Sequence, residues 1–196
     1  YKVTDPGWPH MVDLLQGAGY YAGIHGKVSH SSPYQPYAWD DDLTISPSGK
    51  KAHIKDAKAY GESTSRGIEN AGEAGKPFFL SINISDPHKP FWSEVRGGGE
   101  DPYVPSRIYN AEEVPVPGFL FEDPKVREEL ALYYSSVRRA DDCLNEVLKA
   151  LRKSGQWENT MIVFLSDHGM PLPFAKTQLY HHSTRTPLMV RLPGTT

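Results

Sequence analysis

An aspartate and a histidine directly follow one apolar segment of the chain. Asp167 and His168 belong to the motif S-D-H-G at 166–169, which comes after the run M-I-V-F-L at 161–165. A carboxylate and an imidazole that leave the edge of a sheet together can bind one divalent cation. The alternative interpretation is that Asp167 caps the next turn and Gly169 permits that turn. The motif alone leaves both interpretations open.

A second histidine follows another apolar segment. His88 ends the motif S-D-P-H at 85–88, directly after F-F-L-S-I-N-I at 78–84. Parallel strands place the residues that follow them at one edge of a sheet, so we expect His88 near Asp167 and His168. Taken alone, D-P indicates only a turn, and a histidine after it is more often exposed or structural. Two such motifs in one chain favour a functional site.

Two lysines complete the candidate site. Lys27 lies with His30 in G-K-V-S-H at 26–30, and Lys176 ends the proline-containing loop P-L-P-F-A-K at 171–176. An ammonium group can hold sulfate or phosphate and stabilise a developing oxyanion, although most lysines are only solvated. Four more polar residues follow in the same connection and either contact a substrate or form a plain surface cluster: Tyr180, His181, His182 and Arg185.

Together these residue types suit the hydrolysis of an oxyanion ester rather than of a neutral substrate. A cation and two lysines neutralise a tetrahedral sulfate or phosphate and its transition state. Histidines can protonate a leaving oxygen or nitrogen near neutral pH.

Short apolar runs alternate with helical patterns along the chain, which is typical of an α/β fold with a largely parallel sheet. We predict four strands, at 20–25, 78–85, 161–166 and 188–192, with the second and third in the centre of the sheet. In such folds the carboxyl ends of the strands present the ligand-binding residues. The candidate residues therefore belong to one sheet edge.

The clearest helix is predicted from residue 124 to about 154, and shorter helices are predicted at about 8–16 and 56–74. Asp123 suits the N-cap of the long helix, Pro124 its first position and Gly155 its stop. Apolar residues at helical spacing form a stripe that we expect to pack against the sheet as core. The stripe consists of Val126, Leu130, Tyr133, Val137, Ala140, Leu144, Val147 and Leu151.

A proline-rich connection, 86–123, links the second strand to this helix. It is longer than a simple connection between two elements of a compact domain needs to be, so we expect it to cover a site. A disordered surface excursion with a flexible tip at Gly97–Gly99 is the alternative interpretation.

Composition excludes several classes of function. The chain has 196 residues, of which 38% are hydrophobic and 23% charged, and its formal net charge of −3 provides no basic surface for nucleic acid. No apolar run is long enough to span a bilayer, and the sequence shows no signal-peptide pattern. The single cysteine, Cys143, cannot form an internal disulfide, and we expect it to be a small helix side chain. We predict one compact domain without a nucleic-acid partner or membrane insertion.

In their order along the chain these motifs resemble the sulfatase family of the alkaline-phosphatase-like superfamily. The resemblance rests on G-Y-Y-A-G-I-H-G-K-V-S-H at 19–30, P-F-F-L-S-I-N-I-S-D-P-H-K-P-F at 77–91, N-T-M-I-V-F-L-S-D-H-G at 159–169 and R-T-P-L-M-V-R-L-P-G at 185–194. Within the family, P-L-P-F-A-K-T-Q-L-Y at 171–180 and the long connection look most like the heparan N-sulfatases (sulfamidases) and their bacterial relatives. The resemblance implies an alkaline-phosphatase-like sandwich with a mostly parallel central sheet, of which residues 1–196 are the central part.

The resemblance also implies a role for each candidate residue. Asp167 and His168 would bind Ca²⁺, although asparagine is common at the second position and a nitrogen ligand is unusual for Ca²⁺, so Zn²⁺ or Mn²⁺ is an alternative. A formylglycine, made from cysteine or serine, would be the nucleophile. Lys27, His30, His88 and Lys176 would surround the nucleophile and the sulfate, and His181 would be a further substrate contact.

Two features of the family pattern are absent from the sequence. No C/S-x-P-S-R motif occurs, and Y-V-P-S-R at 103–107 matches only its end, which we interpret as coincidence. The upstream aspartate pair is also missing, and Asp40–Asp42 is predicted to be a solvated charge run. We therefore expect the nucleophile segment and the C-terminal subdomain to lie outside this chain, and the chain alone to be inactive. The resemblance implies a sulfated small molecule or saccharide as substrate and a periplasmic, secreted or lysosomal location.

Two other functions stay open at the level of the sequence. A metal-dependent phosphodiesterase or phosphatase of the same superfamily would use S-D-H-G to bind zinc, although Lys27, His30 and Lys176 favour a sulfatase. A non-catalytic anion-binding module would account for the missing nucleophile motif.

Overall fold

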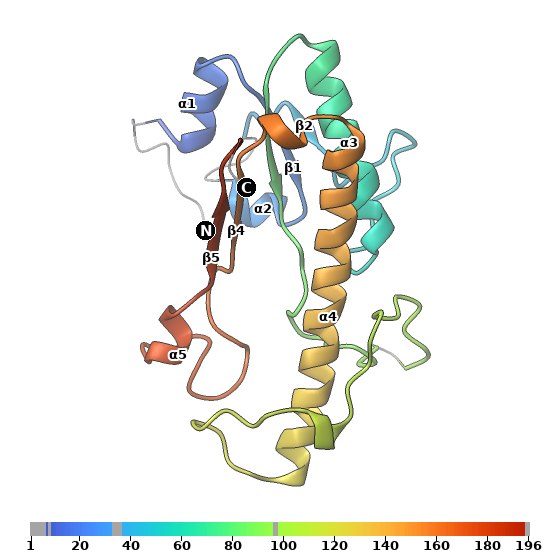
Figure 1. The fold of residues 1–196 in the computed structure, drawn as a ribbon, viewed down its shortest axis with the longest axis vertical. Helices are drawn as coiled ribbons and strands as arrows, with labels where there is room; N and C mark the ends of the chain where they lie inside the picture. Colours follow the sequence, from blue (N-terminus) through green and yellow to red (C-terminus); the bar gives the residue numbers. More distant parts are fainter. Residues whose placement is uncertain (1–6, 8, 33–36, 96–97, 195–196) are drawn as a thin grey trace. The chain divides into compact units, whose positions relative to one another are not determined.

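The computed structural model of the chain describes residues 7, 9–32, 37–95 and 98–194. The chain forms two compact units, each described by itself below: unit 1 is Tyr1–Ser85 with Cys143–Ser154, and unit 2 is Asp86–Asp142 with Gly155–Thr196. The longest helix, α4 (Pro124–Lys153), contributes residues to both units (Figure 1). Within the described ranges, no helix has both the length and the apolar character needed to cross a membrane.

Unit 1 is built on a parallel sheet with the strand order β2-β1-β3. β1 (Tyr21–His25) pairs along its whole length with β3 (Phe78–Ile82), and its other edge pairs with the two-residue strand β2 (Asp41–Asp42). Both strands predicted in this part of the sequence are therefore present and parallel, whereas the short β2 was not predicted.

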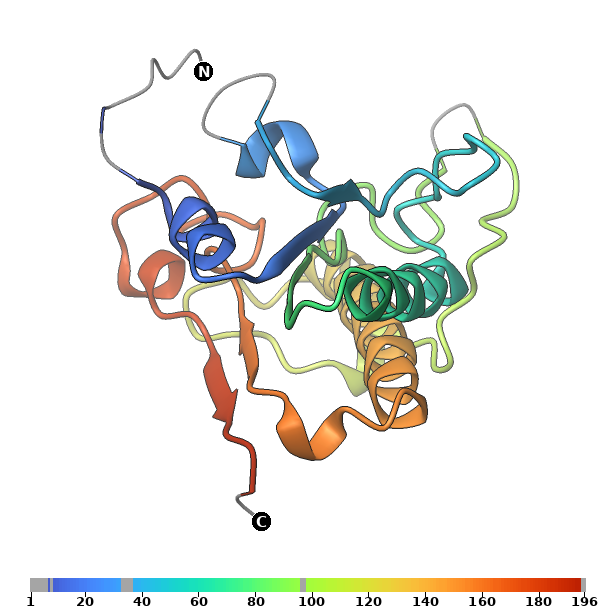
Figure 2. The same cartoon turned by 90° about the horizontal axis from the view of Figure 1, so that it is seen from above.

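Helices α1 (Met11–Gly17) and α3 (Ala57–Glu73) contact this sheet and lie on opposite sides of β1 (Figure 2). Gly67 lets α3 approach closely, because a Cβ atom there would lie 2.9 Å from side-chain carbons of Leu43 and Leu80. Helix packing against the sheet therefore depends on a small residue at this point.

The helix boundaries of unit 1 agree closely with the sequence prediction. Asp56 caps α3, since its Oδ1 accepts a hydrogen bond of 3.0 Å from the Lys58 amide. The predicted start of the first helix, Trp8, lies outside the described residues. The one-turn helix α2 (Val28–Ser31) was not predicted, because four residues carry no recognisable periodicity.

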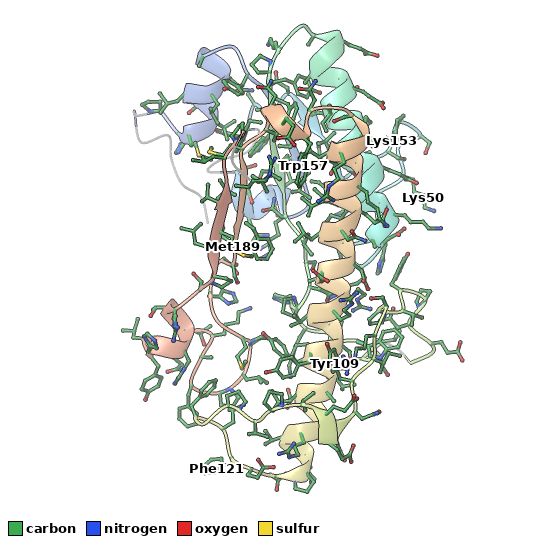
Figure 3. All side chains as sticks on the ribbon, viewed as in Figure 1. Lys50, Tyr109, Phe121, Lys153, Trp157 and Met189 are labelled. Atoms are coloured by element: carbon green, nitrogen blue, oxygen red, sulfur yellow. The ribbon has the colours of Figure 1, made fainter. Side chains whose placement is uncertain are left out.

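Unit 2 contains two antiparallel strands, β4 (Ile162–Leu165) and β5 (Leu188–Arg191). Many of their apolar side chains are exposed, including Met189, which is labelled in Figure 3. The short helix α5 (His181–Thr184) precedes β5, and the 3-10 helices η1 (Ala111–Glu113) and η2 (Trp157–Asn159) lie in the connections. The α/β class is confirmed, but β4 belongs to an antiparallel pair instead of the centre of a parallel sheet.

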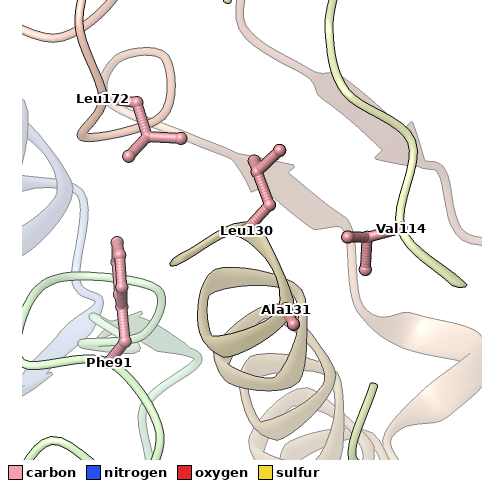
Figure 4. Packing of buried hydrophobic residues seen from close by; sticks show 5 residues of the cluster. All are labelled: Phe91, Val114, Leu130, Ala131 and Leu172. Atoms are coloured by element: carbon pink, nitrogen blue, oxygen red, sulfur yellow. The ribbon is translucent and has the colours of Figure 1, made fainter. Parts of the chain in front are cut away.

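The proline-rich connection packs along the N-terminal half of α4. Phe91 and Val114 from the connection join Leu130 and Ala131 of α4 and Leu172 in one buried cluster (Figure 4). Fully burying a Phe or Leu side chain contributes roughly 1.5–3 kcal/mol, so this packing favours an ordered segment. A disordered excursion is therefore wrong for the described part of the connection, and a covering role stays a prediction.

Helix α4 starts where the sequence predicted, with Asp123 Oδ1 accepting a 2.8 Å hydrogen bond from the Lys125 amide. Cys143 is 1% exposed, as expected for a small helix side chain. The predicted stripe of core residues is only partly correct. Leu130 and Leu151 are buried, but Val137 is 37% exposed.

Three polar residues take the buried positions in the middle of α4. Ser135, Ser136 and Arg139 are each at most 2% exposed. The Ser135 hydroxyl accepts a hydrogen bond from the Tyr109 amide at 3.0 Å, and the Ser136 hydroxyl accepts one from the Trp92 amide at 2.6 Å. The middle of the helix therefore faces the backbone of the connection rather than a sheet, which is why its buried side chains are polar.

Candidate functional site

Polar contacts fix the loop that follows β1 and carries Lys27. His25 is 1% exposed, and its Nδ1 lies 2.8 Å from Ser63 Oγ and 3.3 Å from the Leu43 carbonyl oxygen. Burial lowers the pKa of His25 because the charged ring would lose its hydration, and the contact with Leu43 opposes this only in part. The ring is therefore neutral at pH 7 and acts as a structural hydrogen-bonding group.

Gly26 and Asn83 complete this loop. The Asn83 side-chain amide donates hydrogen bonds to the carbonyls of His25 at 3.2 Å and Gly26 at 3.1 Å. Gly26 has a φ of 72°, and a Cβ atom there would lie 2.6 Å from the Asn83 carbonyl oxygen. Only glycine fits this position, so the residue that follows leaves the sheet at a fixed point.

Lys27 and His30 share one helical turn directly after this glycine. Lys27 is the N-cap residue of α2 with a φ of 47°, and its carbonyl accepts a 2.9 Å hydrogen bond from the His30 amide. Both residues are exposed. A left-handed backbone is uncommon in residues other than glycine, and such conformations cluster at functional sites.

The aspartate run at 40–42 is not merely solvated, contrary to the sequence prediction. Asp40 Oδ2 accepts hydrogen bonds from the Ala22 amide at 2.7 Å and from Gln16 Nε2 at 3.0 Å. Asp41 Oδ2 accepts one of 2.8 Å from Asn70 Nδ2. Asp40 thus fixes the start of β2 to β1 and Asp41 ties β2 to α3, which are structural roles that a charge count could not reveal.

Asp167 and His168 lie in the turn directly after β4. Asp167 Oδ1 is 3.6 Å from His168 Nε2. His168 Nδ1 lies 2.8 Å from the Gly169 carbonyl oxygen, so Nδ1 carries the proton and Nε2 holds the lone pair in the neutral ring. A carbonyl in this position is a usual partner for histidines that bind metals through the other nitrogen.

Gly169 is required by a neighbouring backbone and not by a special turn conformation. Its amide donates a 2.9 Å hydrogen bond to the Ser183 carbonyl, and a Cβ atom would lie 1.9 Å from the His182 carbonyl oxygen. Gly169 has no positive φ, so the close approach of the His182 backbone, and not a left-handed conformation, requires glycine in this bend. The contact places α5, which includes His181, against the S-D-H-G motif at 166–169.

The loop that carries Lys176 returns to the same motif. The Lys176 amide donates a 3.1 Å hydrogen bond to the carbonyl of Met170, two residues after His168. The side chains of Leu172 and Ala175 are buried and anchor the loop. Phe174 and Thr177, on either side of Lys176, have positive φ angles of 63° and 65°. Three of the four positive-φ residues other than glycine in the described ranges therefore lie at or beside the two predicted sulfate-binding lysines.

His88 lies on an exposed loop whose ends are attached to α4. Its Nδ1 is 2.6 Å from the Lys89 carbonyl oxygen, which fixes Nδ1 as the protonated nitrogen. The Lys89 side chain forms an ion pair with Glu129 on α4. Asp86, by contrast, is buried and bonded to Arg139, so it is more than the turn residue that the sequence suggested.

The seven candidate residues divide between the two units. Unit 1 holds Lys27 and His30, and unit 2 holds the rest. Within unit 2, the contacts of Gly169 and Lys176 bring α5 and the lysine loop to Asp167 and His168. The convergence of all seven residues on one substrate stays a prediction.

Sequence reasoning missed the polar groups that support the candidate residues. Arg139, Ser136 and Asn83 were not singled out. Arg139 and Ser136 lie beside the predicted apolar stripe and not within it, so its spacing carried no signal of their burial. Asn83 lies in a strand-like run and gave none.

Comparison with known proteins identifies the family. A family model for sulfatases matches residues 7–196. The chain is 30% identical over 193 residues to the human N-sulphoglucosamine sulphohydrolase, covering 92% of this chain and 38% of that protein. It is 31% identical over 189 residues to an ulvan-active sulfatase of Formosa agariphila, covering 91% of this chain and 34% of that protein. The chain thus spans little more than a third of the length of these relatives.

A solved structure shows the same fold. The lipoteichoic acid synthase LtaP from Listeria monocytogenes superposes with a TM-score of 0.58 at 20% sequence identity, covering 95% of this chain and 47% of that chain.

Proposed function

Because the chain belongs to the sulfatase family, we propose that it provides part of the active site of an enzyme that hydrolyses sulfate esters or sulfamates. The observation that carries this proposal is the family match over residues 7–196, since that range includes every candidate residue. The intact enzyme is expected to be longer than this chain, as its relatives are.

Asp167 and His168 fit two ligands of a divalent cation. Their 3.6 Å separation between Oδ1 and Nε2 allows both atoms to contact one ion, and the Gly169 carbonyl holds the ring in the tautomer that binds through Nε2. A bound cation would neutralise charge on the sulfate oxygens. Within the described ranges 7, 9–32, 37–95 and 98–194, no group of three or more His, Cys, Asp or Glu side chains could hold a metal ion. We therefore propose that the remaining metal ligands come from residues other than those in the described ranges.

The two ligand types favour different metals. Ca²⁺ prefers oxygen ligands, which suits Asp167, whereas the imidazole of His168 suits Zn²⁺ or Mn²⁺ better. We propose Ca²⁺ on the strength of the family and keep Zn²⁺ or Mn²⁺ as the alternative.

The lysines and histidines of this chain bind the anion and move protons. Lys27 and Lys176 would neutralise the charge on the sulfate as the transition state forms. His30 would hold the nucleophile, which we expect to be a formylglycine in a segment outside these 196 residues. His88 would assist the leaving oxygen or nitrogen, since an imidazole can give up a proton near neutral pH.

We propose a sulfated saccharide as the substrate class. Two relatives with about 30% identity are named for sulfated sugars, one for N-sulphoglucosamine and one for ulvan. The exposed residue His181 lies on α5, whose Ser183 carbonyl accepts a hydrogen bond from the Gly169 amide, and it would contact the sugar. An enzyme of this kind is expected in the periplasm, outside the cell or in the lysosome.

A phosphodiesterase or phosphatase is the second candidate. The nitrogen ligand His168 favours it, because zinc-dependent phosphoryl transfer commonly uses imidazole ligands. Two lysines beside the anion favour the sulfatase.

One assay separates these functions. The intact enzyme is incubated with glucosamine N-sulfate, an aryl sulfate, an aryl phosphate and an aryl phosphodiester, and the released sulfate or phosphate is measured. We expect sulfate release to exceed phosphate release by at least ~100-fold, the effect of matching charge and geometry to one transition state. Preferential phosphate release would overturn the proposal. Residues 1–196 alone are expected to turn over none of the four compounds.

A further inference from the structure

A buried arginine joins two aspartates within unit 2. Arg139 Nε lies 2.6 Å from Asp86 Oδ2, and its Nη1 lies 2.7 Å from Asp101 Oδ2. The side chains of Arg139, Asp86 and Asp101 are 2%, 1% and 11% exposed. Nη1 also donates a 2.9 Å hydrogen bond to the Tyr103 carbonyl, and the Trp92 ring centroid is 5.8 Å from the guanidinium carbon.

This arrangement fixes Asp86 in place. A guanidinium group is a rigid fork that matches a carboxylate, and both oxygens of Asp86 contact Arg139, at 2.6 and 3.4 Å. Buried charges are tolerated only when they are paired and hydrogen-bonded. Burial alone would raise the pKa of Asp101, but the hydrogen bonds from Arg139 and the Tyr103 amide outweigh it and leave that pKa lowered.

A second anchor lies one helical turn away on α4. Ser136 accepts a 2.6 Å hydrogen bond from the Trp92 amide, and the adjacent Phe91 is 1% exposed in the hydrophobic cluster. Ser136 and Arg139 are three residues apart and lie on the same face of the helix. The loop between Asp86 and Trp92 is therefore held at both ends.

His88 and Lys89 are the exposed residues of this loop, and Lys89 is paired with Glu129. The ring of His88 is oriented by the Lys89 carbonyl at 2.6 Å, which is a backbone group of the same loop. The direction of the imidazole thus depends on the path of the backbone between the two anchors. Movement of Asp86 would change that path two residues before His88.

We propose that Arg139 is a positioning residue, which holds Asp86 and thereby fixes the loop that presents His88 to the substrate. The inference rests on the proposed function, in which His88 contacts the sulfate and the leaving group. Arg139 does not itself touch the substrate in this account.

A double-mutant cycle tests this role in the intact enzyme. Arg139→Gln is expected to lower kcat/KM by ~10- to 100-fold, the usual effect of misplacing an active-site group by about 1 Å. In a His88→Ala background the same change should lower kcat/KM by less than about twofold, because no histidine is left to position. Arg139→Lys should lower kcat/KM by less than Arg139→Gln does, since lysine keeps the positive charge but loses the forked geometry of the guanidinium group.

Arg138→Gln is the matched control. Arg138 is the neighbouring arginine on α4, and its side chain is 40% exposed and pairs with Asp141 at 3.1 Å. This change should leave kcat/KM within about twofold of the original enzyme, as expected for a surface ion pair. Equal losses from Arg139→Gln in both backgrounds would show that Arg139 serves overall stability only, and would overturn the proposal.

A spectroscopic measurement tests the proposal without relying on activity. NMR of the histidine ring nitrogens reports which nitrogen carries the proton. The His88 signals are assigned as those that disappear in His88→Gln. The original protein should show His88 as the Nδ1-protonated tautomer, and Arg139→Lys, the milder variant, should shift it toward the mixture of an unconstrained histidine. An unchanged tautomer would count against a positioning role. If the enzyme releases no sulfate but the tautomer shifts, the proposed function fails and the positioning inference stands.

Discussion

A single buried imidazole supports the loop that presents Lys27. His25 is neutral in the folded chain because burial lowers its pKa, and its Nδ1 contacts Ser63 and the Leu43 carbonyl. A charged ring at this position would lose its hydration and gain too few partners in exchange. The protonation state of His25 is therefore coupled to the stability of the fold around this loop.

This coupling predicts an acid-sensitive stability. In the unfolded chain His25 binds a proton near pH 6.5, whereas in the folded chain it does so at lower pH. The contribution of neutral His25 to the free energy of unfolding is fully present above about pH 6.5. It falls as the pH drops toward the pKa of His25 in the folded chain, by at most ~1.4 kcal/mol per pH unit. The free energy of unfolding, measured with denaturant, should drop less between about pH 7.5 and about pH 5.5 for His25→Gln than for the original protein. His53→Gln, at an exposed histidine, should keep the full drop, and an equal drop in all three proteins would refute the coupling.

Gly169 gives a second test at the scale of one residue. Alanine would place a Cβ atom 1.9 Å from the His182 carbonyl oxygen, so α5 would have to move away from the S-D-H-G motif at 166–169. We expect Gly169→Ala to lower the free energy of unfolding by ~1–3 kcal/mol, as overpacking usually does. Gly118→Ala is the control, since no atom lies within 4 Å of the added Cβ and its φ is not positive. Equal stability of the two variants would show that the close approach does not constrain α5.

The sequence could indicate the candidate residues but not the residues that support them. Asp167, His168 and His88 follow apolar strands, and their position there is visible in the sequence. The partner of Asp86 is Arg139, 53 positions later, and no local pattern connects the two. Hydrogen bonds of this kind depend on the path of the chain in space, so they could not be read from spacing.

At the scale of elements, α4 and the proline-rich connection stabilise each other. The connection contributes Phe91 and Val114 to the cluster around Leu130, and α4 provides hydroxyl groups for the Trp92 and Tyr109 amides. The long helix therefore acts as the support on which the loop bearing His88 is built.

Replacing a large side chain of this cluster with alanine should destabilise the proline-rich connection. Phe91→Ala removes a side chain that is 1% exposed, and we expect a loss of ~3–5 kcal/mol in the free energy of unfolding, from lost burial and the cavity left behind. Amide hydrogen exchange should rise across the described part of 86–123. Val137→Ala, at a 37% exposed position on α4, should lower stability by less than about 1 kcal/mol. Comparable losses from the two changes would contradict the account of the cluster.

Elements with strong periodicity or clear end signals were predictable, and very short ones were not. Helix α4 has an N-cap, a proline and a terminal glycine, so its limits were within one residue of the structure. Strand β2 has two residues and α5 has four, too few to show a period. The pairing of β4 with β5 depends on the direction in which the chain returns, which composition does not determine.

At the scale of the whole molecule, the chain exposes an unusual apolar surface on unit 2. The register pairs Val163 with Val190 and Leu165 with Leu188, and paired residues share a face of the ribbon. All four side chains are between 47% and 67% exposed. An apolar face of this kind is rare on soluble monomers, so the chain alone should be prone to association.

Dye binding tests this expectation. Residues 1–196 should increase the fluorescence of a hydrophobic dye, and the double change Leu165→Thr with Leu188→Thr should reduce that signal by at least about half. Phe121→Thr is the control, because Phe121 is 79% exposed but isolated from the ribbon (Figure 3). If all three proteins give the same signal, the ribbon is not the apolar surface inferred here.

The most direct test of the account is sulfate release by the intact enzyme after replacement of Lys176. The loop from Leu172 to Lys176 returns to Met170, directly after the S-D-H-G motif, and its lysine is proposed to neutralise the developing charge on the sulfate. Lys176→Ala should lower kcat for sulfate release by ~100- to 1,000-fold while the unfolding midpoint stays unchanged. Lys153→Ala, at the exposed end of α4, should leave kcat unaltered. Unchanged sulfate release by the folded Lys176→Ala enzyme would contradict the placement of the sulfate site.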